Sequence, residues 1–131
     1  MVIQHVMTTA LAPPPIELRF VKTVGEMDAA RELMDPDRPL LLVLKAAWCE
    51  RCPAFGEAVA ELATKYQFDY YYTDAADTEL VEHYEVSKLP AFVMYKKPGS
   101  EPVVSSPATP AMVRGAVEGN CTPVLRLDAE F

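Results

Sequence analysis

The sequence has few basic residues. Its 131 residues include 12 Lys and Arg against 19 Asp and Glu, which gives a formal net charge of −7 at pH 7. Nucleic acids and anionic membranes are bound through positive protein faces, so this balance disfavours both as partners. The sequence also lacks an unbroken apolar run near the ~18–20 residues that a membrane helix requires. We therefore expect a single domain that binds neither nucleic acid nor membrane.

Cysteine and histidine are scarce as well. Three cysteines are an odd number, so they do not form a closed framework of disulfides. Cys49 and Cys52 form a C-x-x-C pair, a spacing that zinc sites share, but zinc normally needs a second pair of ligands. The remaining candidates are isolated in the sequence: Cys121, His5 and His83. We expect no metal site.

The first twelve residues contain no Lys or Arg, and several polar residues interrupt their apolar character. A secretory signal has a basic start and a cleaner apolar centre, so we expect an intracellular, cytoplasmic protein. The three prolines at 13–15 form a stiff, extended spacer behind this N-terminal arm.

The most informative segment runs from Leu40 to Cys52. Residues 40–44 are all apolar, which is typical of a strand buried on both faces of a sheet. The stripe of one amphipathic helix follows, formed by Phe55, Val59, Leu62 and Tyr66. Pro53 falls in the first helical turn, where a missing N–H costs little. Cys49 therefore lies at a strand-to-helix junction, and a helix N-terminus favours a thiolate.

Other elements are predicted on both sides of this segment. Strands are expected at residues 16–22, 68–73, 91–95 and 103–105, with a turn at 97–100. Helices are expected after the capping box that begins at Thr23, from Thr78 to Tyr84 behind Asp77, and from Pro110 to a stop at Gly119. This order indicates a mixed α/β sheet with helices on both faces.

The Trp-Cys-Glu-Arg-Cys segment at 48–52 and the Leu-Pro pair at 89–90, placed around these elements, resemble the thioredoxin family. The resemblance covers about residues 17–120, between an arm at 1–16 and a tail at 121–131. It implies the thioredoxin fold, a central mixed β-sheet flanked by helices on both faces. It also implies a cis peptide before Pro90, packed beside the cysteines.

The resemblance assigns roles to five residues. It makes Cys49 the attacking thiolate and Cys52 the buried resolving thiol, while Trp48, Leu89 and Pro90 border a substrate groove. The implied activity is that of an enzyme, a protein dithiol–disulfide oxidoreductase that works by thiol–disulfide exchange. The implied partners are proteins with disulfides and a thioredoxin reductase or other reductant. No cofactor is implied, and we expect a monomer.

The sequence departs from the family pattern at several positions. Glu50 and Arg51 replace the usual Gly-Pro between the cysteines. They are either ordinary solvated residues of the first helical turn or act on Cys49 in opposite directions, with Glu50 disfavouring the thiolate and Arg51 favouring it. Val43 stands where the family places a buried Asp that assists proton transfer. Glu57 stands where the helix usually has a kinking Pro.

Several alternatives remain open at this stage. The protein could be an oxidase or isomerase, or a redox-silent binding module that presents its groove to a partner, although a pure scaffold does not need two thiols. Trp48 could be a core residue, and Lys45 either extends to an edge of the sheet or influences the cysteines. Cys121 is an idle thiol or forms an intermolecular or regulatory disulfide.

Overall fold

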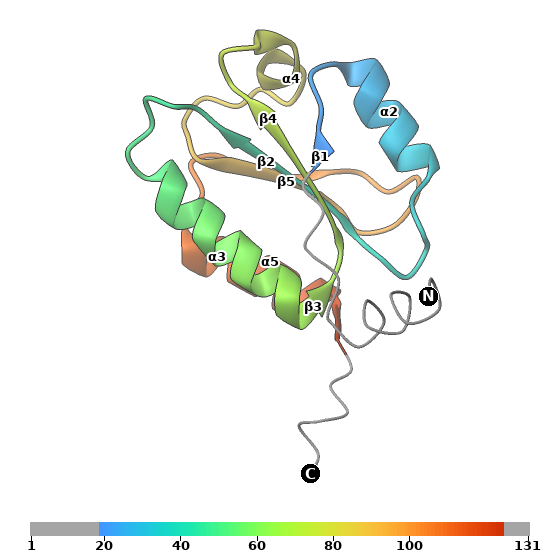
Figure 1. Ribbon diagram of the computed structural model, residues 1–131. Helices are drawn as coiled ribbons and strands as arrows, with labels where there is room; N and C mark the ends of the chain where they lie inside the picture. Colours follow the sequence, from blue (N-terminus) through green and yellow to red (C-terminus); the bar gives the residue numbers. More distant parts are fainter. Residues whose placement is uncertain (1–18, 125–131) are drawn as a thin grey trace, which may run out of the picture.

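A computed structural model describes residues 19–124, which form a five-stranded mixed sheet with helices on both faces (Figure 1). In spatial order the strands are β1 (Arg19–Phe20), β4 (Asp69–Asp74), β2 (Leu40–Lys45), β5 (Ala91–Tyr95) and β6 (Val103–Ser105). Strand β4 pairs in parallel with β1 and β2, whereas the β2–β5 and β5–β6 pairs are antiparallel.

Two helices cover each face of the sheet. Helices α3 (Cys52–Lys65) and α5 (Pro110–Asn120) lie side by side on one face, and α2 (Val24–Glu32) and α4 (Thr78–His83) contact each other on the other (Figure 1). The predicted mixed sheet between two helical layers is confirmed. Among residues 19–124, no helix is long and apolar enough to cross a membrane.

The central strand β2 supplies side chains to both halves of the core. Leu40, Leu42 and Leu44 pack with residues of α2 and α4, and Leu41 and Val43 pack with residues of α3 and α5. All five are at most 1% exposed. The strand is therefore buried on both faces, as its unbroken apolar run predicts.

Two helix starts follow the predicted capping chemistry. The Thr23 side chain accepts a hydrogen bond from the Glu26 N–H at 3.0 Å, and the Glu26 carboxylate accepts one from the Thr23 N–H at 3.1 Å. At the last helix, Thr109 Oγ1 accepts from the Met112 N–H at 3.2 Å. These bonds satisfy N–H groups that have no partner within the helix.

The predicted turn at residues 97–100 is also present. The Ser100 N–H donates to the Lys97 carbonyl at 3.1 Å, and Gly99 has a φ of 79°, a conformation that side chains disfavour.

Several predicted boundaries are wrong. The first strand ends at Phe20 instead of residue 22, and its predicted start at residue 16 lies outside the described residues. Asp77 occupies the N-cap of α4 but makes no capping hydrogen bond with its side chain. Gly119 lies inside α5, which continues to Asn120. Gly119 does not adopt the positive φ with which a glycine often ends a helix.

The first residues of the segment expected as a C-terminal tail form a short strand. Strand β7 (Thr122–Pro123) pairs with β3 (Tyr66–Gln67), and the Val124 N–H donates to the Lys65 carbonyl at 2.8 Å. Cys121, just before β7, is buried. Two-residue strands are too short to produce a period-2 pattern, so local sequence does not reveal this pair.

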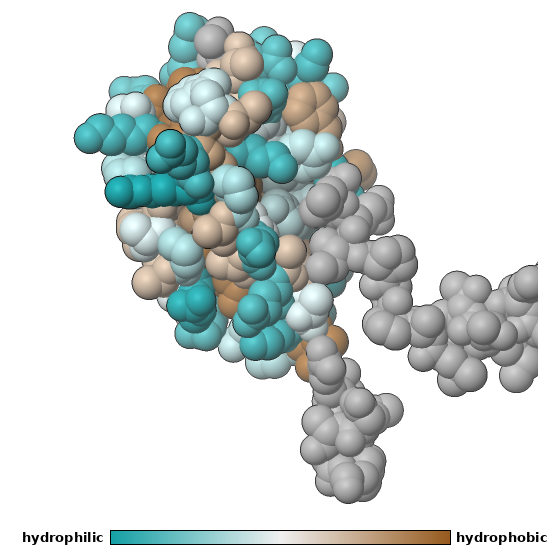
Figure 2. All heavy atoms as spheres, turned by 60° about the vertical axis from the view of Figure 1, so that its left-hand side comes forward, coloured by the Kyte–Doolittle hydropathy of each residue, from teal (hydrophilic) through white to brown (hydrophobic). Residues whose placement is uncertain are grey.

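The surface in Figure 2 mixes hydrophilic side chains with small apolar areas. The large apolar side chains that stay exposed are spread over several parts of the fold, and two of them are neighbours on β6: Phe20, Leu33, Trp48, Val103, Val104, Met112 and Val124. Phe20 and Trp48 belong to the region described next.

We predict that Thr23→Ala lowers the free energy of unfolding by about 1 kcal/mol, because it removes the acceptor of the capping box. Urea unfolding measures the change. Thr64→Ala is the matched control, since Thr64 lies within α3 and Ala is the better helix former. A loss of stability in the control equal to that in Thr23→Ala would contradict the capping argument.

Candidate active site

The two cysteines of the C-x-x-C pair form a disulfide where β2 gives way to α3. Their Cα atoms are 5.4 Å apart, and the connecting turn is closed by hydrogen bonds from the Cys49 N–H to the Ala46 carbonyl and from the Cys52 N–H to the Cys49 carbonyl. Cys49 is 8% exposed and Cys52 is 5% exposed. Both cysteines are thus largely buried, with only a small part of each accessible to solvent.

Helix α3 begins at Cys52 itself, with Arg51 at the N-cap and Pro53 in the first turn. The Arg51 side chain makes no capping hydrogen bond, so it supplies no acceptor for the first N–H groups of the helix. Those N–H groups and the helix dipole favour negative charge beside the cysteines. The expected junction of strand, cysteine pair and helix is present.

The Leu89–Pro90 peptide is cis, as the resemblance implies. Leu89 packs against the small cluster formed by Ala46, Cys49 and Cys52. The loop that carries this peptide bond is therefore adjacent to the disulfide.

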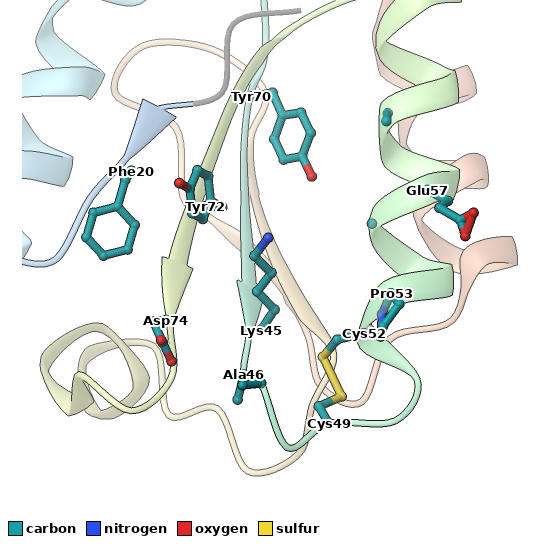
Figure 3. Close-up of a pocket in the computed structure, with 13 residues that line it drawn as sticks. Phe20, Lys45, Ala46, Cys49, Cys52, Pro53, Glu57, Tyr70, Tyr72 and Asp74 are labelled. Atoms are coloured by element: carbon teal, nitrogen blue, oxygen red, sulfur yellow. A yellow bond between two sulfur atoms is a disulfide. The ribbon is translucent and has the colours of Figure 1, made fainter.

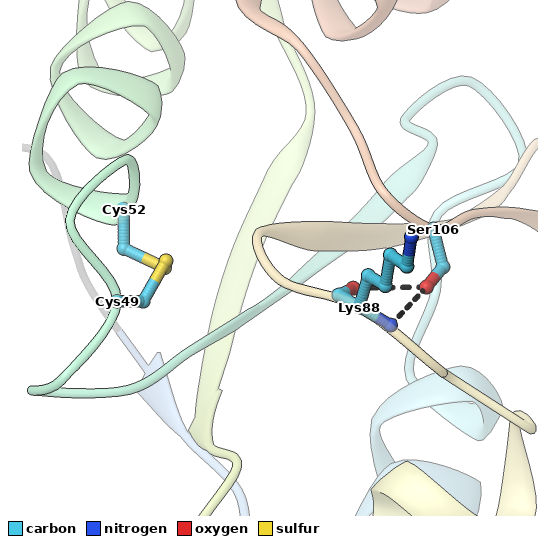
Figure 4. Close-up of a disulfide and its surroundings, with 4 residues drawn as sticks. All are labelled: Cys49, Cys52, Lys88 and Ser106. Carbon is cyan, nitrogen blue, oxygen red and sulfur yellow. Dashed lines mark hydrogen bonds between the residues drawn. A yellow bond between two sulfur atoms is a disulfide. The ribbon is translucent and has the colours of Figure 1, made fainter.

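This loop is fastened by a residue that the sequence analysis missed. Ser106 Oγ accepts a hydrogen bond from the Lys88 N–H at 2.9 Å, and its hydroxyl donates to the Lys88 carbonyl at 2.9 Å (Figure 4). Ser106 Oγ also accepts a hydrogen bond from the Ser87 N–H at 3.1 Å. On the other side of the cis peptide, the Ala108 N–H donates to the Pro90 carbonyl at 2.7 Å. No local motif signals Ser106, because its partners lie far from it in sequence.

The other predicted site residues lie around the pair. Trp48 is 72% exposed, so it is not a core residue, and Glu50 and Arg51 are exposed beside the cysteines. Their roles toward a substrate or the Cys49 thiolate remain predictions.

Val43 is 1% exposed and lies opposite Tyr72 of β4 and Phe92 of β5. It packs in the apolar core under α3, so this position offers no proton acceptor. Glu57 is exposed on α3. The effect of Val43 and Glu57 on the cysteine pair stays a prediction.

A pocket of about 770 Å³ opens beside the disulfide (Figure 3). Both cysteines line it, together with residues of β1, β2, β4 and α3 up to Ala60. The Lys45 ammonium lies 4.6 Å from the centre of the Tyr72 ring, and burial raises the pKa of Tyr70 nearby. Lys45 thus lines the same pocket as the cysteines, with its ammonium directed toward Tyr72, and any influence of Lys45 on the cysteines stays a prediction.

Cys121 belongs to a different part of the molecule. It is a free, buried thiol in the apolar core under α3 and α5, apart from the cluster that holds Cys49 and Cys52. Burial raises the pKa of Cys121 to about 11.

The match to known proteins now decides the family. Residues 20–114 match the family model described as Thioredoxin. The chain belongs to the thioredoxin family. Thioredoxin-like 3-1, chloroplastic, from Arabidopsis thaliana is 28% identical over 93 residues, which are 65% of this chain and 43% of that protein. The chain thus spans less than half the length of this relative.

Solved thioredoxin structures show the same fold. Reduced thioredoxin pre-protein from Schistosoma mansoni has a TM-score of 0.69 at 23% identity, covering 79% of this chain and 98% of that one. Oxidised thioredoxin O1 from Arabidopsis thaliana has a TM-score of 0.67 at 20% identity, covering 80% and 98%. The thioredoxin fold expected from the sequence is confirmed.

We predict that Ser106→Ala loosens the loop before Pro90. Each lost hydrogen bond is worth on the order of 1 kcal/mol, so the Ser87 and Lys88 amides should exchange with solvent about 5- to 10-fold faster. Hydrogen exchange followed by NMR measures this. Ser105→Ala, one residue earlier on β6, is the control, and equal exchange in both variants would contradict the tethering role.

We predict slow alkylation of Cys121 in the folded protein. A thiol with a pKa of about 11 is almost entirely protonated at pH 7–9, and only the thiolate reacts. With the Cys49–Cys52 disulfide intact, iodoacetamide labelling should rise about tenfold per pH unit in this range and become fast in urea. Rapid labelling that does not depend on pH would show that Cys121 is neither buried nor protonated.

Proposed function

We propose that this thioredoxin-family protein is a dithiol–disulfide oxidoreductase that reduces or exchanges disulfides in protein substrates. The observation that carries the proposal is the disulfide of Cys49 and Cys52 at the start of α3, next to the loop of Leu89 and Pro90. The family match supports a redox role for this pair.

The proposed reaction has two exchange steps. The Cys49 thiolate attacks one sulfur of the substrate disulfide, which forms a mixed disulfide and releases the other substrate sulfur as a thiolate. The Cys52 thiolate then attacks the Cys49 sulfur, so the substrate leaves with both sulfurs reduced and the Cys49–Cys52 disulfide forms. A thioredoxin reductase or another dithiol reductant supplies the two electrons that restore the dithiol.

The groove for the substrate lies between Trp48 and the Leu89–Pro90 loop in this proposal. Trp48 is exposed beside the pair, and a large, exposed aromatic side chain suits contact with a partner. The Leu89 backbone would pair with an extended substrate segment in the manner of a strand. A monomer is sufficient, because every proposed site residue comes from one chain.

Two other functional hypotheses make different predictions. An oxidase would transfer its disulfide to a reduced substrate, which reverses the direction of the same two steps. An isomerase would form the mixed disulfide and let another substrate thiol resolve it, so that Cys49 is released as a thiolate with no net oxidation or reduction. A redox-silent binding module would retain its partners after both cysteines are replaced. The intact pair favours the redox readings.

The compartment is part of the proposal. We propose the cytoplasm, where reductants keep a dithiol available. The curated relative is named as chloroplastic, so fractionation of the source cells should include plastids where they are present.

We predict that the wild-type protein accelerates reduction of insulin disulfides by dithiothreitol and that Cys49→Ser reduces this to the background rate. Cys52→Ser should accumulate mixed disulfides with substrate, because the resolving thiol is missing. Cys121→Ser is the matched control and should behave as wild type. Full activity in Cys49→Ser would remove the proposed mechanism.

We predict that resolution of the mixed disulfide is slow near neutral pH and rises from pH 6 to 9. Burial of Cys52 disfavours its thiolate, and Val43 offers no carboxylate to take the proton. Val43→Asp should accelerate this step, although a buried carboxylate costs a few kcal/mol of stability. Stopped-flow rates measure the effect.

Val43→Asn is the control for that experiment, because it changes polarity without adding a base. Urea unfolding verifies that both variants fold. A flat pH profile, with no acceleration in folded Val43→Asp, would mean that another group already accepts the proton.

A further inference from the structure

The pocket beside the disulfide has apolar and aromatic walls. Phe20 and Tyr72 lie with ring centroids 5.3 Å apart on the sheet side, and Gly56 and Ala60 of α3 line the opposite side. Cys49 and Cys52 line the same pocket, so a group held there would lie next to the reacting sulfurs (Figure 3). This pocket is distinct from the groove proposed around Trp48 and Pro90.

Two hydrogen-bond donors in the pocket have no acceptor among the described residues. The Lys45 ammonium makes a cation–π contact with Tyr72, but no ion pair or hydrogen bond joins it to the described part of the chain. The Tyr70 hydroxyl likewise has no hydrogen-bond partner among residues 19–124. A pocket with two such donors suits a ligand that brings an acceptor, above all a carboxylate.

The acidic residues of the lining do not neutralise Lys45. The Asp74 carboxylate accepts a hydrogen bond from the Ala76 N–H at 2.9 Å, within the turn that follows β4. The Glu57 carboxylate points away from the pocket, and the Lys45 side chain extends toward Tyr72 (Figure 3). Neither carboxylate forms an ion pair with Lys45, so Lys45 is an unpaired ammonium among the described residues that line the pocket.

We propose that this pocket binds an acidic side chain of the substrate, carried next to an apolar residue close to the substrate disulfide. The apolar residue would pack on Phe20 and Tyr72, and the carboxylate would accept hydrogen bonds from Lys45 and the Tyr70 hydroxyl. This inference rests on the proposed exchange activity and specifies its substrate class, polypeptide disulfides with an acidic flank.

Helix α3 leaves room for such a segment. A Cβ at Gly56 would meet no atom within 4 Å, although glycine within a helix costs about 0.5–1 kcal/mol relative to Ala. A Cβ at position 56 would therefore point into open space, and Gly56 is one of the residues that line the pocket. Gly115 of α5 is equally open but does not line the pocket.

The first test uses two peptide disulfides of equal net charge and composition. One carries Leu-Glu beside the disulfide and Gln at its far end, and the other exchanges Glu with Gln. Equal net charge cancels the effect of the protein's charge of −7. We expect kcat/KM about 2- to 5-fold higher for the peptide with the near Glu, as for a partly exposed ion pair.

Variants at Lys45 test whether the preference for the near Glu depends on the Lys45 ammonium. Lys45→Met keeps most of the apolar stem and should bring the ratio of kcat/KM for the two peptides to about one. Lys45→Glu should reverse the preference, so that the peptide with the distant Glu reacts faster. Lys45→Arg should keep the preference. Because each ratio is measured within one variant, a general change in activity does not affect it.

Gly56→Leu tests whether the substrate occupies the pocket, because the larger side chain takes up part of the pocket volume. This variant should raise KM for the preferred peptide and abolish the preference, whereas Gly115→Leu should leave both unchanged. A ratio near one in the wild-type protein, or a preference that survives Lys45→Met and Gly56→Leu, would overturn the proposal. Absence of exchange with every disulfide would instead remove the proposed function itself.

Discussion

The hydrogen bonding of β2 on both of its edges is the constraint on which the rest of the structure depends. This strand pairs with β4 on one side and β5 on the other, and its side chains are buried against both helical layers. No direction is left in which the strand can shift without exposing apolar surface or breaking hydrogen bonds. The turn that follows it therefore presents Cys49 and Cys52 at a fixed point at the start of α3.

Much of this centre follows from local sequence. The apolar run of β2 and the helical spacing after it predict the strand, the helix and the position of the cysteine pair between them. Capping by Thr23 and Thr109 is also local, because each side chain bonds a backbone N–H within one helical turn. The family resemblance added the cis peptide before Pro90, which no spacing in the sequence would reveal.

The parts that could not be predicted depend on contacts between distant segments. Ser106 holds Ser87 and Lys88, and β7 pairs with β3, yet no pattern around these residues differs from that of an ordinary loop. The pocket forms only when β1, β4 and α3 come together, so neither Lys45 nor Gly56 could be assigned to it beforehand. Such features require tertiary packing, which single-sequence patterns do not contain.

The pairing of β3 with β7 has a consequence for handling the protein. It holds Val124 against Lys65 at the far end of α3, and fourteen helical residues separate that point from Cys52 by about 20 Å. A resin, a dye or a fused domain joined behind residue 124 would thus leave the sulfurs facing open solution. Immobilised in this orientation, a Cys52→Ser variant could collect its partners from a cell extract.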